Sequence, residues 1–170
     1  MYFQESLKSQ IPSLTEYFEN VLLKDKLSNG YIFAGGNEKL KDLLVSQLGK
    51  VINCSENIIQ KKAGSTNFSF LSACEKCHSC LWLNSGKHPE VPIVIEPDTE
   101  KSKKGVILLT QIQELLQRLN ILSDYYRIII IKKAEREFFP QEPANALLKS
   151  IEENISHSLF IFYADDPEQV

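Results

Sequence analysis

The sequence predicts a three-layer α/β fold built on a mainly parallel sheet, and three observations carry this prediction. Short apolar runs alternate with segments of helical periodicity along the chain, as strands and helices do when they follow one another. Residues 126–131 are dominated by apolar and β-branched residues on both faces, which is typical of a central parallel strand with helices on both sides. The chain has 170 residues, enough for one domain with a single core.

The first half of the chain contains two predicted helices separated by a strand. Helical spacing of apolar residues covers 12–26, and a strand over 31–34 follows and stops at a glycine pair. The second helix is predicted over 38–51. Residues 55–69 are polar and irregular, so we expect a loop there. A third helix is expected from the cysteine cluster to about residue 85.

The second half continues the alternation. A strand around 91–95 and a charged loop over 98–105 precede an amphipathic helix over 108–122. After the strand at 126–131 come a helix over 144–153 and a last strand over 159–163. The core positions predicted for these two helices are Leu108, Ile112, Leu115, Leu119, Leu122, Leu147 and Leu148. This order of elements favours parallel pairing of the strands.

Composition excludes several classes of protein. Hydrophobic residues make up 43% and charged residues 24%, which are ordinary values for a globular domain. Apolar runs such as 128–131 are far too short to span a bilayer, and the amino terminus lacks the pattern of a secretory signal. We therefore expect a cytoplasmic protein with no membrane partner. The net charge of -3 argues against a strong nucleic-acid binder, so the expected partners are proteins.

All four cysteines lie close together in the sequence, at Cys54, Cys74, Cys77 and Cys80. In a reducing compartment such a cluster favours metal ligands over disulfides, and four thiolates satisfy the tetrahedral preference of zinc with no open position. This predicts a structural zinc site. Buried free cysteines, a redox CxxC pair and c-type haem attachment at CEKCH are the alternatives, and each leaves part of the cluster unexplained. His78 is expected to be a solvent-facing neighbour of the site.

Residues 31–42, YIFAGGNEKLKD, have the layout of a phosphate-binding loop, in which a strand leads through a glycine turn to a helix. Gly35 and Gly36 form the turn, and Lys41 occupies the lysine position. Leu40 stands where a glycine would let the backbone approach phosphate, and Asp42 stands where a hydroxyl would hold magnesium. The segment is therefore predicted to be a plain connection that has lost nucleotide binding.

A second element that nucleotide-binding proteins need, an acidic residue directly after an apolar strand, is also missing from its expected position. A P-loop ATPase places a magnesium-holding acid directly after an apolar strand. Here Lys132 and Lys133 follow the run at 128–131, and Glu135 comes three residues late. Lys132 is thus a degenerate magnesium-acid position, and ATP is not an expected cofactor.

Three stretches together resemble the clamp-loader subunits of bacterial DNA polymerase III: CEKCHSC, GKHPEV at 86–91 and EPANALLKSIEE at 142–153. The resemblance covers about 27–170. It implies an AAA+ core domain over 1–170 of P-loop NTPase type, with a zinc module inserted at about 54–86 and the lid and collar domains absent. It also implies a role in DNA replication, with gamma/tau and delta subunits as partners and DNA contacted indirectly through the complex.

Within that family the delta-prime type, which lacks both nucleotide-binding elements, is the closer likeness. The resemblance places the phosphate-sensing position at Ala164, which cannot sense a phosphate. It therefore implies a non-hydrolysing, structural subunit without ATPase activity of its own inside a polymerase holoenzyme. Two alternatives stay open. One is a gamma/tau-type ATPase in which Lys41 still binds ATP, and the other is a zinc-dependent nucleic-acid-binding module.

Overall fold

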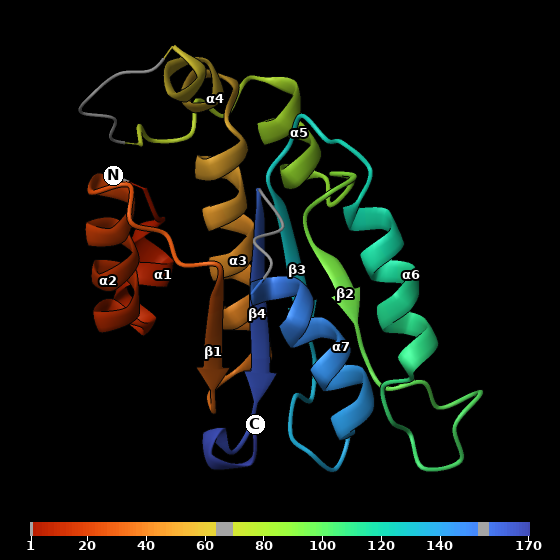
Figure 1. Ribbon diagram of the computed structural model, residues 1–170. Helices are drawn as coiled ribbons and strands as arrows, with labels where there is room; N and C mark the ends of the chain where they lie inside the picture. The colour runs from red at the N-terminus through yellow and green to blue at the C-terminus, as the bar shows by residue number, and fades with distance from the viewer. Residues whose placement is uncertain (1, 64–69, 153–156) are drawn as a thin grey trace. The chain divides into compact units, whose positions relative to one another are not determined.

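The computed structural model describes residues 2–63, 70–152 and 157–170 (Figure 1). The chain divides into two compact units. One unit consists of residues up to 28 together with 37–92, and the other consists of 29–36 with 93–170. Helices alone build the first unit within the described residues, whereas the second contains the sheet.

The sheet of the second unit has four parallel strands among the described residues, in the order β1-β4-β3-β2. Their bounds are β1 Gly30–Ala34, β2 Ile93–Ile95, β3 Arg127–Ile131 and β4 Ser158–Ala164. The register pairs Ile129 with Phe160 and Ile32 with Phe162. All five residues of β3 are buried, as the sequence predicts for a central strand. The α/β class and the parallel sheet are therefore confirmed.

Two helices pack together in this unit, α6 Leu109–Leu119 and α7 Gln141–Glu152 (Figure 1). A single apolar cluster joins them to the strands, because the apolar stripe of each amphipathic helix must be removed from water. The cluster consists of Ile93, Ile107, Ile112, Leu115, Leu119, Ile129, Ile131, Ala134, Phe139, Leu147 and Phe160. A 3-10 turn, η1 Pro167–Gln169, follows β4.

The helical unit contains α1 Glu5–Gln10, α2 Pro12–Leu23, α3 Glu38–Asn53, α4 Ser55–Lys62 and α5 His78–Asn84. Its long helix, α3, contacts α1, α4 and α5. A single residue, Cys54, separates α3 from α4, and its extended backbone (φ -60, ψ 130) ends one helix and begins the next. The break at Cys54 therefore fixes where this thiol lies between two helices.

The prediction of a loop over 55–69 is wrong over 55–62, where α4 forms, and the rest of it, from 64 to 69, lies outside the described residues. The buried residue of α4 is polar: Asn57 is 1% exposed, while Ile59 is 66% exposed. The Asn57 side chain donates to the carbonyls of Val51 and Leu71 and accepts from the Leu71 N–H. Because the buried residue of α4 is an asparagine, the sequence of this helix lacks the apolar periodicity from which a helix is predicted.

Two predicted core leucines are exposed. Leu122 is 99% exposed because α6 ends at Leu119, before that position. In α7 Leu147 is fully buried, whereas the next residue, Leu148, is 50% exposed. Adjacent helical positions lie about 100° apart around the axis, and in α7 the buried face includes Leu147 but not Leu148.

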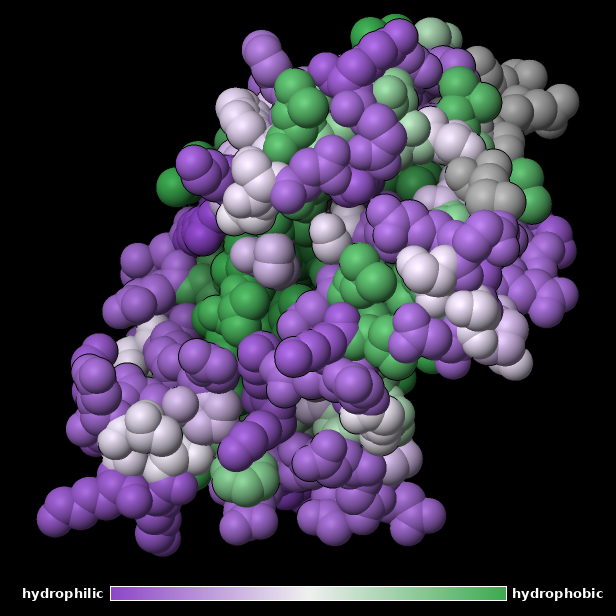
Figure 2. All heavy atoms as spheres, turned by 180° about the vertical axis from the view of Figure 1, so that it is seen from behind, coloured by the Kyte–Doolittle hydropathy of each residue, from purple (hydrophilic) through white to green (hydrophobic). Residues whose placement is uncertain are grey.

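No helix among the described residues combines the length and apolar character that crossing a membrane requires. Figure 2 shows one face of the molecule covered mostly by hydrophilic side chains.

Candidate metal centre

Four thiols from three segments of the helical unit converge. Cys54 lies between α3 and α4, Cys74 and Cys77 lie in the turn before α5, and Cys80 lies in the first turn of α5. Their sulfur atoms all lie within 4.8 Å of one another. Cys54 and Cys80 are fully buried, and the other two are partly exposed.

This donor set fits a zinc ion. Zn–S bonds of about 2.3 Å in a tetrahedron separate the sulfur atoms by about 3.8 Å, so a contraction of about 1 Å or less brings the cluster to that geometry. All four cysteines are free thiols rather than disulfide partners. Within the described part of the chain no histidine or carboxylate joins the cluster, and four soft thiolates suit zinc better than harder cations. His78 is exposed and stacks on Trp82, with ring centroids 5.9 Å apart.

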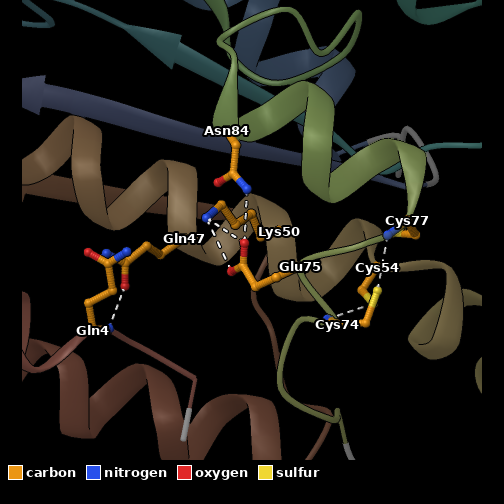
Figure 3. A network of polar contacts seen from close by, with 8 residues as sticks. All are labelled: Gln4, Gln47, Lys50, Cys54, Cys74, Glu75, Cys77 and Asn84. Atoms are coloured by element: carbon orange, nitrogen blue, oxygen red, sulfur yellow. Dashed lines mark hydrogen bonds and ion pairs between the residues drawn. The ribbon is translucent and has the colours of Figure 1, made fainter.

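Backbone N–H groups point at two of the sulfur atoms, as Figure 3 shows. The Cys74 N–H donates to Cys54 Sγ at 3.4 Å, and the Cys77 N–H donates to Cys74 Sγ at the same distance. The second of these bonds closes the CxxC turn on itself. Such donors stabilise negative charge on sulfur, which is the form that binds a metal.

The cysteines differ in how readily they ionise. Burial raises the pKa of the Cys54 thiol and that of the Cys80 thiol. Burial also opposes ionisation of Cys77, but hydrogen bonds from Ser55 and Cys80 outweigh it and lower the pKa of Cys77 to about 6. A metal that binds this cluster at neutral pH therefore meets one thiolate and at least two protonated thiols.

His88 in the GKHPEV stretch has a structural place in the same unit. It is 6% exposed, its Nε2 lies 3.1 Å from Ser79 Oγ, and its Nδ1 accepts the Glu90 N–H at 3.2 Å. Burial lowers the pKa of His88. The ring therefore ties α5 to the segment that leaves it.

The strand, glycine turn and helix predicted over 31–42 are present in the structure. Gly35 and Gly36, directly after β1, have φ values of 58 and 74, a conformation that glycine adopts without strain. Asn37 then caps α3, its side chain accepting the Lys39 N–H at 2.8 Å. The Asn37 carbonyl accepts from the N–H groups of Leu40 and Lys41, at 3.0 and 3.2 Å. Lys41 is half-buried, and the Asp42 side chain next to it is exposed.

The polar groups of Lys132 and Glu135, which follow β3, have hydrogen-bond or ion-pair partners within the same unit. The Lys132 N–H donates to the Ile95 carbonyl at 2.9 Å, and its Nζ lies 4.0 Å from a Glu96 carboxylate oxygen. Glu135 is only 7% exposed, and its carboxylate accepts the backbone N–H of Asp165 just beyond β4. Ala164 is buried at the end of β4. Glu135, the first acidic residue after β3, therefore stabilises the segment that follows β4.

Sequence reasoning missed two residues that shape these sites, Asn37 and Glu75. A signal existed for Asn37, because asparagine before a helical segment is a preferred N-cap. Glu75 carried no signal, because its partners are distant in the sequence.

Comparison with known proteins agrees with the sequence resemblance. The family model described as DNA polymerase III, delta subunit, matches residues 11–170. The chain is 28% identical over 163 residues to DNA polymerase III subunit delta' of Bacillus subtilis, covering 94% of this chain and 43% of that protein. It is 26% identical over 160 residues to the gamma/tau subunit of Mycoplasma genitalium, covering 94% of this chain and 24% of that protein.

A delta' subunit from Yersinia pestis is 27% identical over 127 residues, covering 75% of this chain and 33% of that protein. The chain spans less than half the length of these curated relatives. The family match covers nearly all of the chain and includes both the cysteine cluster and the glycine turn at 35–36. The chain therefore belongs to the DNA polymerase III delta subunit family, among the clamp-loader subunits of delta-prime or gamma/tau type.

Proposed function

We propose that this chain is the core of a delta-prime-type clamp-loader subunit that does not hydrolyse ATP. In this role it is a structural element of the complex that loads the sliding clamp onto DNA during replication. The observation that carries the proposal is the hydrogen bonding of the first turn of α3, where the backbone amides are already occupied.

A phosphate-binding loop works because main-chain N–H groups at the start of a helix remain available to the anion. Here the N–H groups of Lys39 and Leu40, which have no partner in an ordinary helix start, bond to the side chain and the carbonyl of Asn37. The Lys41 N–H makes the usual helical bond to the Asn37 carbonyl. A triphosphate would have to break these bonds. The carboxylate of Asp42 would also repel the anion.

The region after β3 supports the same conclusion. Lys132 brings positive charge to the position of the magnesium-holding acid, and a lysine cannot bind a cation. Glu135, the nearest acid along the chain, is buried and accepts the Asp165 N–H. Releasing it for a metal would free the segment after β4.

A gamma/tau-type ATPase is the second candidate, because Lys41 is retained and gamma/tau subunits are nearly as similar as delta' subunits. Titration of a fluorescent ATP analogue with Mg²⁺ separates the two. We expect no saturable binding up to about millimolar nucleotide, where an active loop binds well below that concentration. Saturable, magnesium-dependent binding that Lys41→Ala abolishes would show that the ATPase reading is correct, and a gamma/tau relative serves as the positive control.

We also propose that one zinc ion, held by Cys54, Cys74, Cys77 and Cys80, staples the insertion at about 54–86 within the core domain. The metal would supply folding free energy to this segment, whose buried apolar residues in its described part are Cys54, Phe70, Cys80 and Leu83. Trp82 on α5, the only tryptophan of the chain, is a natural reporter. Chelation should change its fluorescence and leave the β-sheet signal in circular dichroism largely intact.

Elemental analysis of freshly purified protein tests the metal directly. We expect one zinc per chain in the natural protein and in His78→Ala, and clearly less than one in Cys77→Ser, whose affinity is weakened. His78→Ala is the matched control because it follows Cys77 directly and lies outside the thiol cluster. If elemental analysis finds no zinc in the freshly purified natural protein, the proposed zinc site is wrong.

The partners proposed for the chain are the other clamp-loader subunits, gamma/tau and delta, with DNA contacted through the assembled complex. Co-purification of the full-length protein with these subunits tests this. Binding that persists in Lys41→Ala and in the presence of excess ADP is expected, because a structural subunit does not need nucleotide to associate.

A further inference from the structure

Three cysteine-bearing segments of the helical unit meet at one carboxylate, that of Glu75 (Figure 3). Lys50 Nζ on α3 lies 3.2 Å from both carboxylate oxygens. Asn84 Nδ2, at the end of α5, donates to Glu75 Oε2 at 3.0 Å. Lys50 precedes Cys54 by one helical turn and Asn84 follows Cys80 by one turn, while Glu75 adjoins Cys74.

The ion pair fixes where Glu75 lies. The Lys50 side chain is only 9% exposed, although that of Glu75 is 55% exposed. A buried ammonium group is strongly destabilising unless a hydrogen-bonded partner compensates it. Because Lys50 is held on α3, the carboxylate that reaches it holds the CxxC turn against that helix.

The backbone at Glu75 has a conformation that glycine would adopt more easily. Its φ is 58, in the left-handed region, where a side chain with a Cβ is strained. This conformation accompanies the bond from the Cys77 N–H to Cys74 Sγ. A glutamate at such a position is explained if its side chain performs a task that glycine cannot perform.

We propose that Glu75 is a positioning residue, which holds the four thiols in a metal-ready arrangement through Lys50 and Asn84 without binding the metal itself. This inference rests on the zinc site proposed above. Glu75 lies outside the group of converging donor atoms found among the described residues. Its contribution is to pre-organise the ligands, as partners just outside the ligand set of metal sites do.

Zinc affinity, measured by competition with a chromophoric chelator on the purified protein, tests this. Glu75→Gln and Lys50→Met should each weaken zinc binding by about 10–100-fold. The double variant should be no weaker than the worse single variant, since both remove one interaction. Glu56→Gln is the matched control: Glu56 lies two residues after Cys54, is half-exposed and pairs with Lys76 at 4.0 Å, so its loss should change affinity by less than about twofold.

Glu75→Gly is the sharpest variant, because it removes both the backbone strain and the carboxylate. If the backbone alone mattered, glycine would tighten zinc binding. The positioning role requires weaker binding instead, with an unchanged four-thiolate spectrum once Co²⁺ is loaded. Tighter or unchanged affinity in Glu75→Gly, additive losses in the double variant, or a Co²⁺ spectrum that differs in Glu75→Gln would each overturn the inference.

Asn84→Ala keeps the inference testable if the Glu75 variants do not fold. Asn84 is exposed, and its loss should weaken zinc binding a few-fold in the same direction. Unchanged affinity in both Asn84→Ala and Lys50→Met would overturn it. If the natural protein binds no zinc, the proposed metal site fails instead, so the two failures are distinguishable.

Discussion

Zinc binding to the thiol cluster should strengthen steeply as pH rises, because the metal must displace protons. Thiolates bind zinc, whereas thiols do not. Burial raises the pKa of Cys54 and Cys80, so both are protonated at pH 7 and each must release a proton. Cys77, with a pKa of about 6, is already mostly thiolate at pH 7 and releases almost none.

The magnitude follows from the number of protons released. Each proton changes the affinity tenfold per pH unit, or about 1.4 kcal/mol. Two protons come from Cys54 and Cys80, and the remaining thiol adds at most one. Raising the pH from 7 to 8 should therefore strengthen binding by about 100- to 1,000-fold, or about 3–4 kcal/mol. Four ordinary thiols would give nearly 10,000-fold.

Calorimetric zinc titration in buffers of different ionisation enthalpy, under reducing conditions, counts the released protons directly. Two variants distinguish the thiols. Cys80→Ser should lower the slope of log affinity against pH by about one, because it removes a proton-bearing ligand. Cys77→Ser should weaken binding and leave the slope nearly unchanged. A slope near four, or equal effects of the two variants on it, would refute this reasoning.

Three stability predictions can be checked by denaturant or thermal unfolding. Leu147→Ala should cost about 2–5 kcal/mol, while Leu148→Ala at the 50% exposed neighbouring position should cost less than about 1 kcal/mol. Equal losses would contradict the buried face assigned to α7. Arg127→Met should cost about 2 kcal/mol and lower Tm by about 4–8 °C, because the buried guanidinium donates to the carbonyls of Leu119, at 2.8 Å, and Ile121. An unchanged Tm would show that these bonds only offset the burial of the charge. Leu122→Ser should change stability by less than about 0.5 kcal/mol, and a larger loss would mean that α6 extends beyond Leu119.

The sequence predicted the elements whose stabilisation is local or uniformly apolar. The run at β3 is buried at all five positions, so composition alone identifies it as a central strand. In α6 the buried residues Ile112, Leu115 and Leu119 recur at helical spacing, so the core face is visible in the pattern. The cysteines were equally visible, because their spacing is itself the chemical signal.

The sequence could not reveal elements held by polar contacts between distant residues. Asn57 holds α4 through hydrogen bonds to Val51 and Leu71. The residues next to it in the sequence show no pattern that indicates a buried amide. Glu75 pairs with Lys50, 25 positions earlier, across a chain segment of different composition. Single-sequence periodicity reports apolar burial, so contacts of this kind appear only once the fold has brought the partners together.

The helix α3 runs from the turn capped by Asn37 to the thiol cluster, and the bonds at its two ends bear on the proposed structural role. Its 16 residues span about 24 Å. At the first turn its amides are capped by Asn37, where an ATPase would leave them available to phosphate. At the last turn Lys50 pairs with Glu75, and Cys54 follows directly in the thiol cluster. The bonds of Asn37 at the first turn and of Lys50 at the last turn constrain both ends of α3, and this supports the proposed structural role in which the helix does not respond to nucleotide.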